Sequence, residues 1–159
     1  MIIKSYLVEE NINLLDKNLV LFYGENLGLK NQIKEIIKLK TNAEILNLFQ
    51  DEILKKPEVL FNEILNKSFF ENEKNFFINE VDDKILPIIE EIKEKQDSQK
   101  IYLFSNILDK KSKIRSSFEK SHNSIVVPCY ADNEITLKKL LINKLKDYKG
   151  VSPSNINII

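Results

Sequence analysis

Five short apolar runs recur along the chain, each bounded by polar or turn-forming residues. They fall at residues 19–23, 43–49, 75–81, 100–104 and 124–128. An apolar run of this length between turn residues is typical of a buried strand, and the last run also holds three consecutive β-branched residues at 125–127. The pattern therefore predicts five strands.

Between these runs, apolar residues recur three and four positions apart, which is the spacing of one face of a helix. It predicts helices over residues 29–40, 58–65, 84–95, 110–121 and 134–148. Residues 2–15 are weakly patterned and predict an edge strand or a short helix, and 50–52 begin a polar connection. Strands that alternate with helices imply an α/β fold: a five-stranded, mostly parallel sheet flanked by helices.

The stretch 18–40 is the part around which this fold is arranged. Its apolar run breaks at Gly24 and Gly28, and a helix then begins whose apolar positions are Leu29, Ile33, Ile36, Ile37 and Leu39. A strand, a glycine loop and a helix in this order form the frame of a phosphate-binding loop.

The loop keeps only part of the phosphate-binding pattern, which is Gly, four residues, Gly-Lys and then Ser or Thr. Gly24 is in place and Lys30 falls at the lysine position. Leu29 occupies the second glycine position, with Gly28 one residue early, and Asn31 replaces the hydroxyl that holds Mg²⁺. The sequence therefore predicts a degenerate loop that serves as a strand-to-helix turn and takes no nucleotide cofactor.

Two strand ends carry polar residues that fit the same interpretation. In a P-loop ATPase the corresponding third run ends in Asp-Glu. Here Asn79 replaces the aspartate and lacks the negative charge that binds Mg²⁺, so that Glu80 is the only acidic residue of the pair. Asn106 follows the fourth run, where an AAA+ module places a polar residue toward the phosphates; taken alone it is turn chemistry. In the next helix, Arg115 either acts on a neighbouring subunit's ATP or is a solvated charge, and the second interpretation is favoured.

Composition narrows the function classes. The 159 residues predict one domain, and Lys plus Arg equals Asp plus Glu at 24 each, so no net charge draws the whole chain onto nucleic acid. A single cysteine, Cys129, and a single histidine, His122, exclude an internal disulfide, a catalytic triad and a multi-histidine metal site within this chain. No signal peptide and no apolar run of membrane length is apparent, so a cytoplasmic location is expected.

Phe69 and Phe70 stand out among the aromatic residues. On a helix, adjacent side chains point about 100° apart, so one core face can seldom take both rings. Charged and polar neighbours surround the pair, which indicates a surface, and an exposed aromatic pair is typical of a partner-binding site. The alternative, in which both rings pack under the sheet, remains open.

Several segments together resemble the delta subunit of the bacterial DNA polymerase III clamp loader, over nearly the whole chain. They are Leu21-Phe22-Tyr23-Gly24-Glu25, Ser68-Phe69-Phe70, the strand near Phe77, Lys111-Ser112-Lys113-Ile114-Arg115 and Val127-Pro128-Cys129-Tyr130-Ala131-Asp132-Asn133-Glu134. The last of these is the most specific.

The resemblance implies an AAA+-like subunit with no catalytic site of its own, which is an accessory part of a polymerase holoenzyme, a nucleotidyltransferase. Such a subunit binds the ring-shaped sliding clamp and opens it for loading onto primed DNA during replication, without hydrolysing ATP. Ser68, Phe69 and Phe70 match the family's clamp-binding wedge, with two phenylalanines where a leucine–phenylalanine pair is common.

The resemblance also implies a domain division and a set of partners. Residues 1–148 would form the clamp-binding domain and 149–159 the start of a helical lid. The implied partners are the sliding clamp, the other loader subunits through a further C-terminal region, and primed DNA within the complex, with no membrane. The rival interpretation is an active P-loop ATPase or nucleotide kinase, against which Leu29, Asn31 and Asn79 argue.

Overall fold

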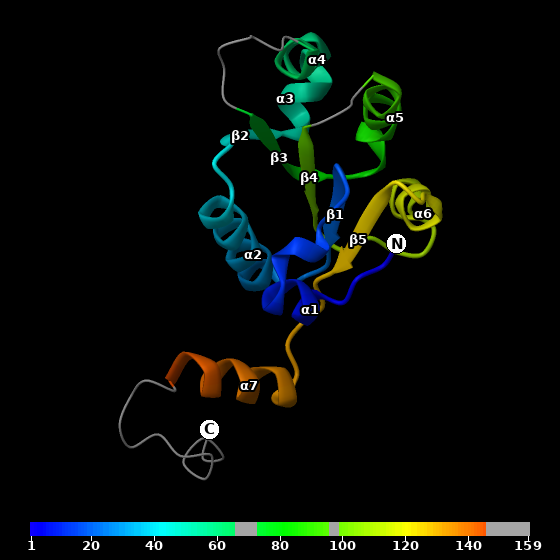
Figure 1. Cartoon of the computed structure of the whole chain (residues 1–159). Helices are drawn as coiled ribbons and strands as arrows, with labels where there is room; N and C mark the ends of the chain where they lie inside the picture. Colours follow the sequence, from blue (N-terminus) through cyan, green and yellow to red (C-terminus); the bar gives the residue numbers. More distant parts are fainter. Residues whose placement is uncertain (66–72, 96–98, 146–159) are drawn as a thin grey trace.

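Five parallel strands form the single sheet of the computed structural model, which describes residues 1–65, 73–95 and 99–145 (Figure 1). The strands are β1 (Leu19–Tyr23), β2 (Glu44–Phe49), β3 (Lys74–Val81), β4 (Lys100–Ser105) and β5 (Ser124–Pro128). Their order across the sheet is β2-β3-β4-β1-β5, and every neighbouring pair is parallel. The five predicted strands and the α/β fold class are thereby confirmed.

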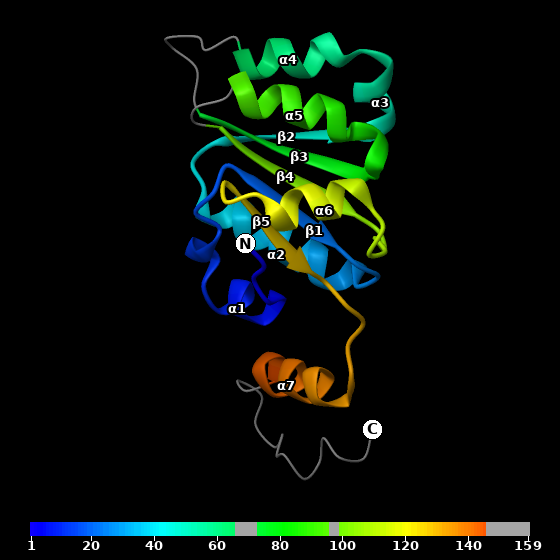
Figure 2. The ribbon, with the colours of Figure 1, turned by 90° about the vertical axis from the view of Figure 1, so that its right-hand side faces the viewer.

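Helices cover both faces of this sheet (Figure 2). One face carries α1 (Ser5–Glu10), the short 3₁₀ turn η1 (Ile12–Leu14) and α2 (Leu27–Lys40). The other carries α3 (Gln50–Lys55), α4 (Pro57–Leu65), η2 (Asp83–Ile85), α5 (Leu86–Lys95) and α6 (Lys113–Lys120). Because successive strand residues point to opposite faces, the core divides into two clusters, one under each helical layer.

Three predicted segments differ from the structure. Residues 50–52, expected to begin a polar connection, start helix α3, in which the buried Gln50 side-chain oxygen accepts a hydrogen bond from the Asp82 N–H at 2.8 Å. The helix expected from residue 110 begins at Lys113, because the Ser112 hydroxyl caps it by accepting the Arg115 N–H at 3.3 Å. On α2, Leu39 is 84% exposed and does not reach the core.

Of the two alternatives that the sequence left open for residues 2–15, the short helix is the one that forms, and no edge strand is present in this described segment. The short helix is α1, and Ile2 makes a single parallel bridge with Val126 of β5.

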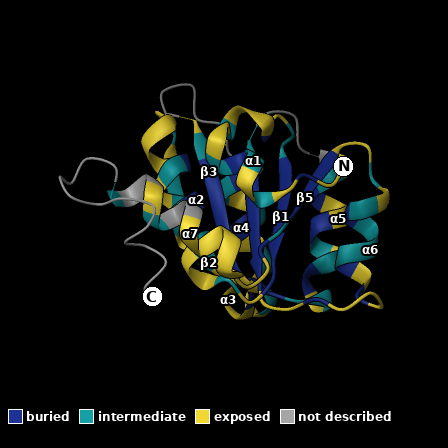
Figure 3. Ribbon diagram, turned by 90° about the horizontal axis from the view of Figure 1, so that it is seen from below, coloured by how far each residue is buried: buried dark blue, intermediate teal, exposed yellow. Residues whose placement is uncertain are grey.

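The last described helix, α7 (Glu134–Leu145), begins where the sequence predicts and lies apart from the sheet in both views (Figures 1 and 2). Most of the α7 side chains that the structure describes are exposed, and Ile135, Leu137 and Ile142 are apolar ones among them (Figure 3). Residues 146–148 of the predicted helix, and the predicted lid segment 149–159, lie outside the described residues. Within the described part of the chain, no helix combines the length and apolar character needed to cross a membrane.

Candidate functional site: a degenerate phosphate loop

The β1–α2 loop lies at the carboxyl edge of the sheet, between the ends of β4 and β5. Three backbone hydrogen bonds hold it there: Gly24 N–H to the Asn106 carbonyl at 3.0 Å, Asn26 N–H to the Cys129 carbonyl at 3.1 Å, and Cys129 N–H to the Tyr23 carbonyl at 2.7 Å. The loop glycine and the polar residue after β4, predicted separately from the sequence, are therefore brought into direct contact.

The two loop glycines have different surroundings. Gly24 has φ of +130°, and a Cβ atom added there would lie 2.1 Å from the carbonyl oxygen of Cys129. Gly28 lies in the first turn of α2, where an added Cβ would meet only the Asn26 side-chain oxygen at 3.6 Å. The fold thus requires glycine at position 24 for the close approach to β5, whereas position 28 tolerates a side chain.

Asn26 closes the start of α2. Its side-chain oxygen accepts the Leu29 N–H at 3.0 Å, and its amide nitrogen donates to the Tyr130 carbonyl at 3.1 Å and to a carboxylate oxygen of Asp132 at 2.9 Å. In a phosphate-binding loop, free N–H groups of the helix N-terminus face the ligand. Here one of these groups is already bound by the cap, and the segment after β5 is tied to the loop.

Lys30 points into the protein. It is 4% exposed, and its ammonium donates to the carbonyl oxygens of Gly24 and Ser105, each at 2.8 Å. Burial lowers the pKa of Lys30, while the nearby Cys129 and Glu25 act in the opposite direction. The charge that meets phosphate in a working loop is therefore directed at two neutral backbone acceptors.

A second lysine, Lys34, lies one turn further along α2 and was not predicted as part of the site. Its ammonium donates to the side-chain oxygen of Asn79 at 2.6 Å and lies 4.3 Å from the centre of the Phe104 ring. Burial lowers the pKa of Lys34, and the neighbouring charges of Lys30 and Lys38 lower it further. Within the described residues, no acidic side chain forms an ion pair with it.

Glu80 is exposed and has φ of +56°, at the point where the pairing of β3 with β4 shifts register. The left-handed region costs a residue with a side chain about 1–2 kcal/mol, and glycine avoids this cost. The strained residue, Glu80, comes directly after Asn79. The next paired residues are Val81 of β3 and Ser105 of β4.

Glu80→Gly is expected to stabilise the fold by about 0.5–1 kcal/mol, which is the relieved strain less the extra chain entropy of glycine. Urea denaturation would measure the change. Glu90→Gly, at an exposed position of helix α5, serves as the control and should destabilise by about 1 kcal/mol. Equal losses in both variants would contradict the strain at Glu80.

Arg115 is not a solvated helix charge, so the favoured sequence interpretation is wrong on this point. Its side chain is only 18% exposed, and its Nε donates to the Glu119 carboxylate at 2.8 Å. A second guanidinium nitrogen donates to the Leu108 carbonyl at 3.1 Å, and the group lies 4.8 Å from the Tyr23 ring centre. The guanidinium is thus bound within its own chain.

Ser68, Phe69 and Phe70 lie outside the described residues. The segment that contains them joins the end of α4 to the amino end of β3. The phosphate-type loop follows the carboxyl end of β1, and all strands are parallel, so β3 begins at the opposite edge of the sheet.

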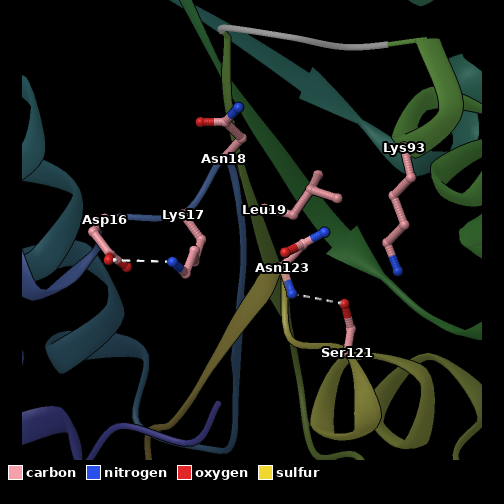
Figure 4. A pocket seen from close by; sticks show the side chains of 7 residues that line it. All are labelled: Asp16, Lys17, Asn18, Leu19, Lys93, Ser121 and Asn123. Atoms are coloured by element: carbon pink, nitrogen blue, oxygen red, sulfur yellow. Dashed lines mark hydrogen bonds and ion pairs between the residues drawn. The ribbon is translucent and has the colours of Figure 1, made fainter.

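A separate pocket of about 380 Å³ opens at the amino edge of the sheet (Figure 4). Its charged side chains are Asp16 and Lys17, which form an ion pair at 3.4 Å, and Lys93, whose ammonium lies 4.8 Å from the Phe118 ring centre. Lys93 sits in the last turns of α5, where a cation also complements the helix dipole. Each charged side chain of this pocket therefore has a favourable contact within the protein.

Comparison with known proteins bears on the fold. No family model and no curated protein matches the sequence. Among solved structures, Trip13 from Rhizobiales aligns with a TM-score of 0.59 at 12% identity, over 96% of this chain and 63% of that one. Rif2 from Saccharomyces cerevisiae aligns with a TM-score of 0.56 at 11% identity, over 97% of this chain and 66% of that one.

These alignments, together with the five-stranded parallel sheet, show that the fold is AAA+-like. A structure of Rif2 in complex with the C-terminal domain of Rap1 aligns as well, with a TM-score of 0.53 at 14% identity, over 97% of this chain and 63% of that one. The chain therefore spans 63–66% of the length of these three structures. At such low identity the likeness establishes the fold alone.

Proposed function

We propose that this chain is a clamp-loader subunit of the delta type: an AAA+-like module that binds a sliding clamp and opens it for loading onto primed DNA, without hydrolysing ATP. In this proposal the domain has no catalytic role and acts as a rigid support for a clamp-binding segment. It would work together with other loader subunits.

The direction of the Lys30 side chain is the observation that supports a module without ATP hydrolysis. A lysine that assists phosphoryl transfer contacts the phosphates, whereas the Lys30 ammonium is held by the Gly24 and Ser105 carbonyls. Asn31 is exposed and carries no hydroxyl, and Asn79 carries no charge. These residues support a binding module over the rival ATPase or nucleotide kinase.

The clamp-binding part is supported by the sequence of the Ser68–Phe69–Phe70 segment and by its resemblance to the family's wedge. The segment is attached at the edge of the sheet opposite the degenerate loop, so the two sites need not compete for space. The structure of Rif2 with a Rap1 domain supports the idea that an AAA+-like fold can serve in protein binding.

Two titrations test the proposal. The native chain should bind the sliding clamp encoded in the same genome in isothermal titration calorimetry, and ATP with Mg²⁺ should leave its melting temperature unchanged. No binding to the clamp would contradict the clamp-loader assignment. Micromolar ATP binding, or ATP turnover that Lys30→Ala abolishes, would instead favour the ATPase or kinase.

A further inference from the structure

An AAA+-like fold implies a nucleotide held with Mg²⁺, and the residues at this site do not fit that metal. Mg²⁺ takes oxygen ligands in octahedral geometry, and a P-loop site supplies a Ser or Thr hydroxyl and a carboxylate. Here the two positions hold Asn31 and Asn79. In the described part of the chain, no group of three His, Cys, Asp or Glu side chains could hold a metal ion.

A cation of the protein itself lies against one of these two positions. The Lys34 ammonium is 2.6 Å from the side-chain oxygen of Asn79, the residue at the metal-binding carboxylate position. The face of the Phe104 ring, 4.3 Å away, provides the other favourable contact for a desolvated cation. We propose that Lys34 permanently takes the place of the divalent cation and so closes this site to metal.

The orientation of Asn79 supports this assignment. Its amide nitrogen donates to the Leu48 carbonyl of β2 at 3.1 Å, which turns its oxygen toward Lys34. An amide satisfies both neighbours, because it presents a donor to the carbonyl and an acceptor to the ammonium. With aspartate, one carboxylate oxygen would face the Leu48 carbonyl without a proton between them, so the lysine and the amide form a matched pair.

The lysine also serves as a link between layers. It ties the middle of α2 to the end of β3, the two elements that a bound metal connects through its ligands in a nucleotide-loaded P-loop domain. Because Lys34 is itself a residue of α2, this link between the two elements needs no bound ligand. The contact between Lys34 and Asn79 lies at the carboxyl edge of the sheet and does not depend on whether the chain binds a clamp.

The test is to restore both missing ligands with and without the lysine, so every variant named below also carries Asn31→Thr, which supplies the hydroxyl. Asn79→Asp, Lys34→Met/Asn79→Asp and the control Lys40→Met/Asn79→Asp would be titrated with Mn²⁺, which takes the same oxygen ligands as Mg²⁺ and is followed by electron paramagnetic resonance. Lys40 is an exposed lysine at the end of the same helix. Melting temperatures with and without Mn²⁺ give an independent second measurement.

We expect only Lys34→Met/Asn79→Asp to remove free Mn²⁺ from solution and to melt at a higher temperature when Mn²⁺ is present. Equal Mn²⁺ binding by Asn79→Asp, in which Lys34 remains, would overturn the proposal. Failure of Lys34→Met/Asn79→Asp to bind Mn²⁺ would overturn it too, because the position would then not be a cation site. Lys34→Gln/Asn79→Asp removes the same charge with a polar side chain if the methionine variant unfolds.

Discussion

Replacing Phe69 and Phe70 together by alanine is expected to abolish measurable binding to the sliding clamp. Burying one phenylalanine side chain contributes about 1.5–3 kcal/mol, so a pair seated in a partner's pocket contributes roughly 3–6 kcal/mol. Loss of that free energy weakens binding on the order of 100- to 10,000-fold. Calorimetric titration of the clamp with native chain and variant measures the difference, and a loss of this size is that of a binding hot spot.

Phe49→Ala is the matched control for that experiment. Phe49 is a phenylalanine 45% exposed at the carboxyl end of β2, away from the amino edge where the segment with Phe69 joins β3. It should leave clamp binding unchanged. Unchanged binding in the double variant would contradict the assignment of the wedge.

The free energy of unfolding of the double variant decides between the two interpretations of Phe69 and Phe70. Rings that serve a partner leave this free energy nearly unchanged when removed, since exposed positions contribute little to folding. A loss of several kcal/mol would show that the rings pack under the sheet instead.

The strands could be predicted because their signal is local. The run Leu19-Val20-Leu21-Phe22-Tyr23 is buried at every position, and so are the first four residues of Ser124–Pro128. A strand covered by helices on both faces has no polar side, so a continuous apolar run between turn residues identifies it. The alternation of such runs with helices then led directly to the parallel sheet.

Helix α3 could not be predicted in the same way, because its stability depends on distant contacts. Its only buried residues are Gln50 and Ile53, and the role of Gln50 is to accept the Asp82 N–H, 32 positions along the chain. A segment with one buried apolar residue gives no helical period. Its polar residues therefore indicated a connection, and the tertiary contact decided otherwise.

Lys34 was missed and Arg115 was misinterpreted, although the sequence held a signal for each. Lys30, Ile33, Lys34 and Ile37 are spaced i, i+3, i+4 and i+7, which places both lysines on the buried stripe of α2. Arg115 and Glu119 are four apart on α6, the spacing of an intrahelical ion pair. The partners that hold these charges, the Asn79 amide and the Tyr23 ring, come from other elements and are visible only in the fold.

Gly24→Ala is expected to destabilise the domain by about 3–5 kcal/mol, the upper range for a single substitution. The methyl group would lie 2.1 Å from the Cys129 carbonyl oxygen, a backbone atom that cannot turn away as a side chain could. The backbone at φ of +130° adds strain of its own for any residue with a Cβ. Relief requires the loop to move off β5, which breaks the hydrogen bonds that Cys129 makes to Tyr23 and Asn26.

Gly28→Ala, in the same loop-to-helix segment, should have the opposite sign. Its Cβ meets only the Asn26 side-chain oxygen at 3.6 Å, and alanine is favoured over glycine within a helix by about 0.5–1 kcal/mol. Urea denaturation of both variants therefore separates the two glycines. A phosphate-binding loop would require glycine at both positions, whereas the geometry requires it only at position 24, where the loop meets β5. Similar losses in the two variants would contradict this assignment, since position 28 would then also depend on the absence of a side chain.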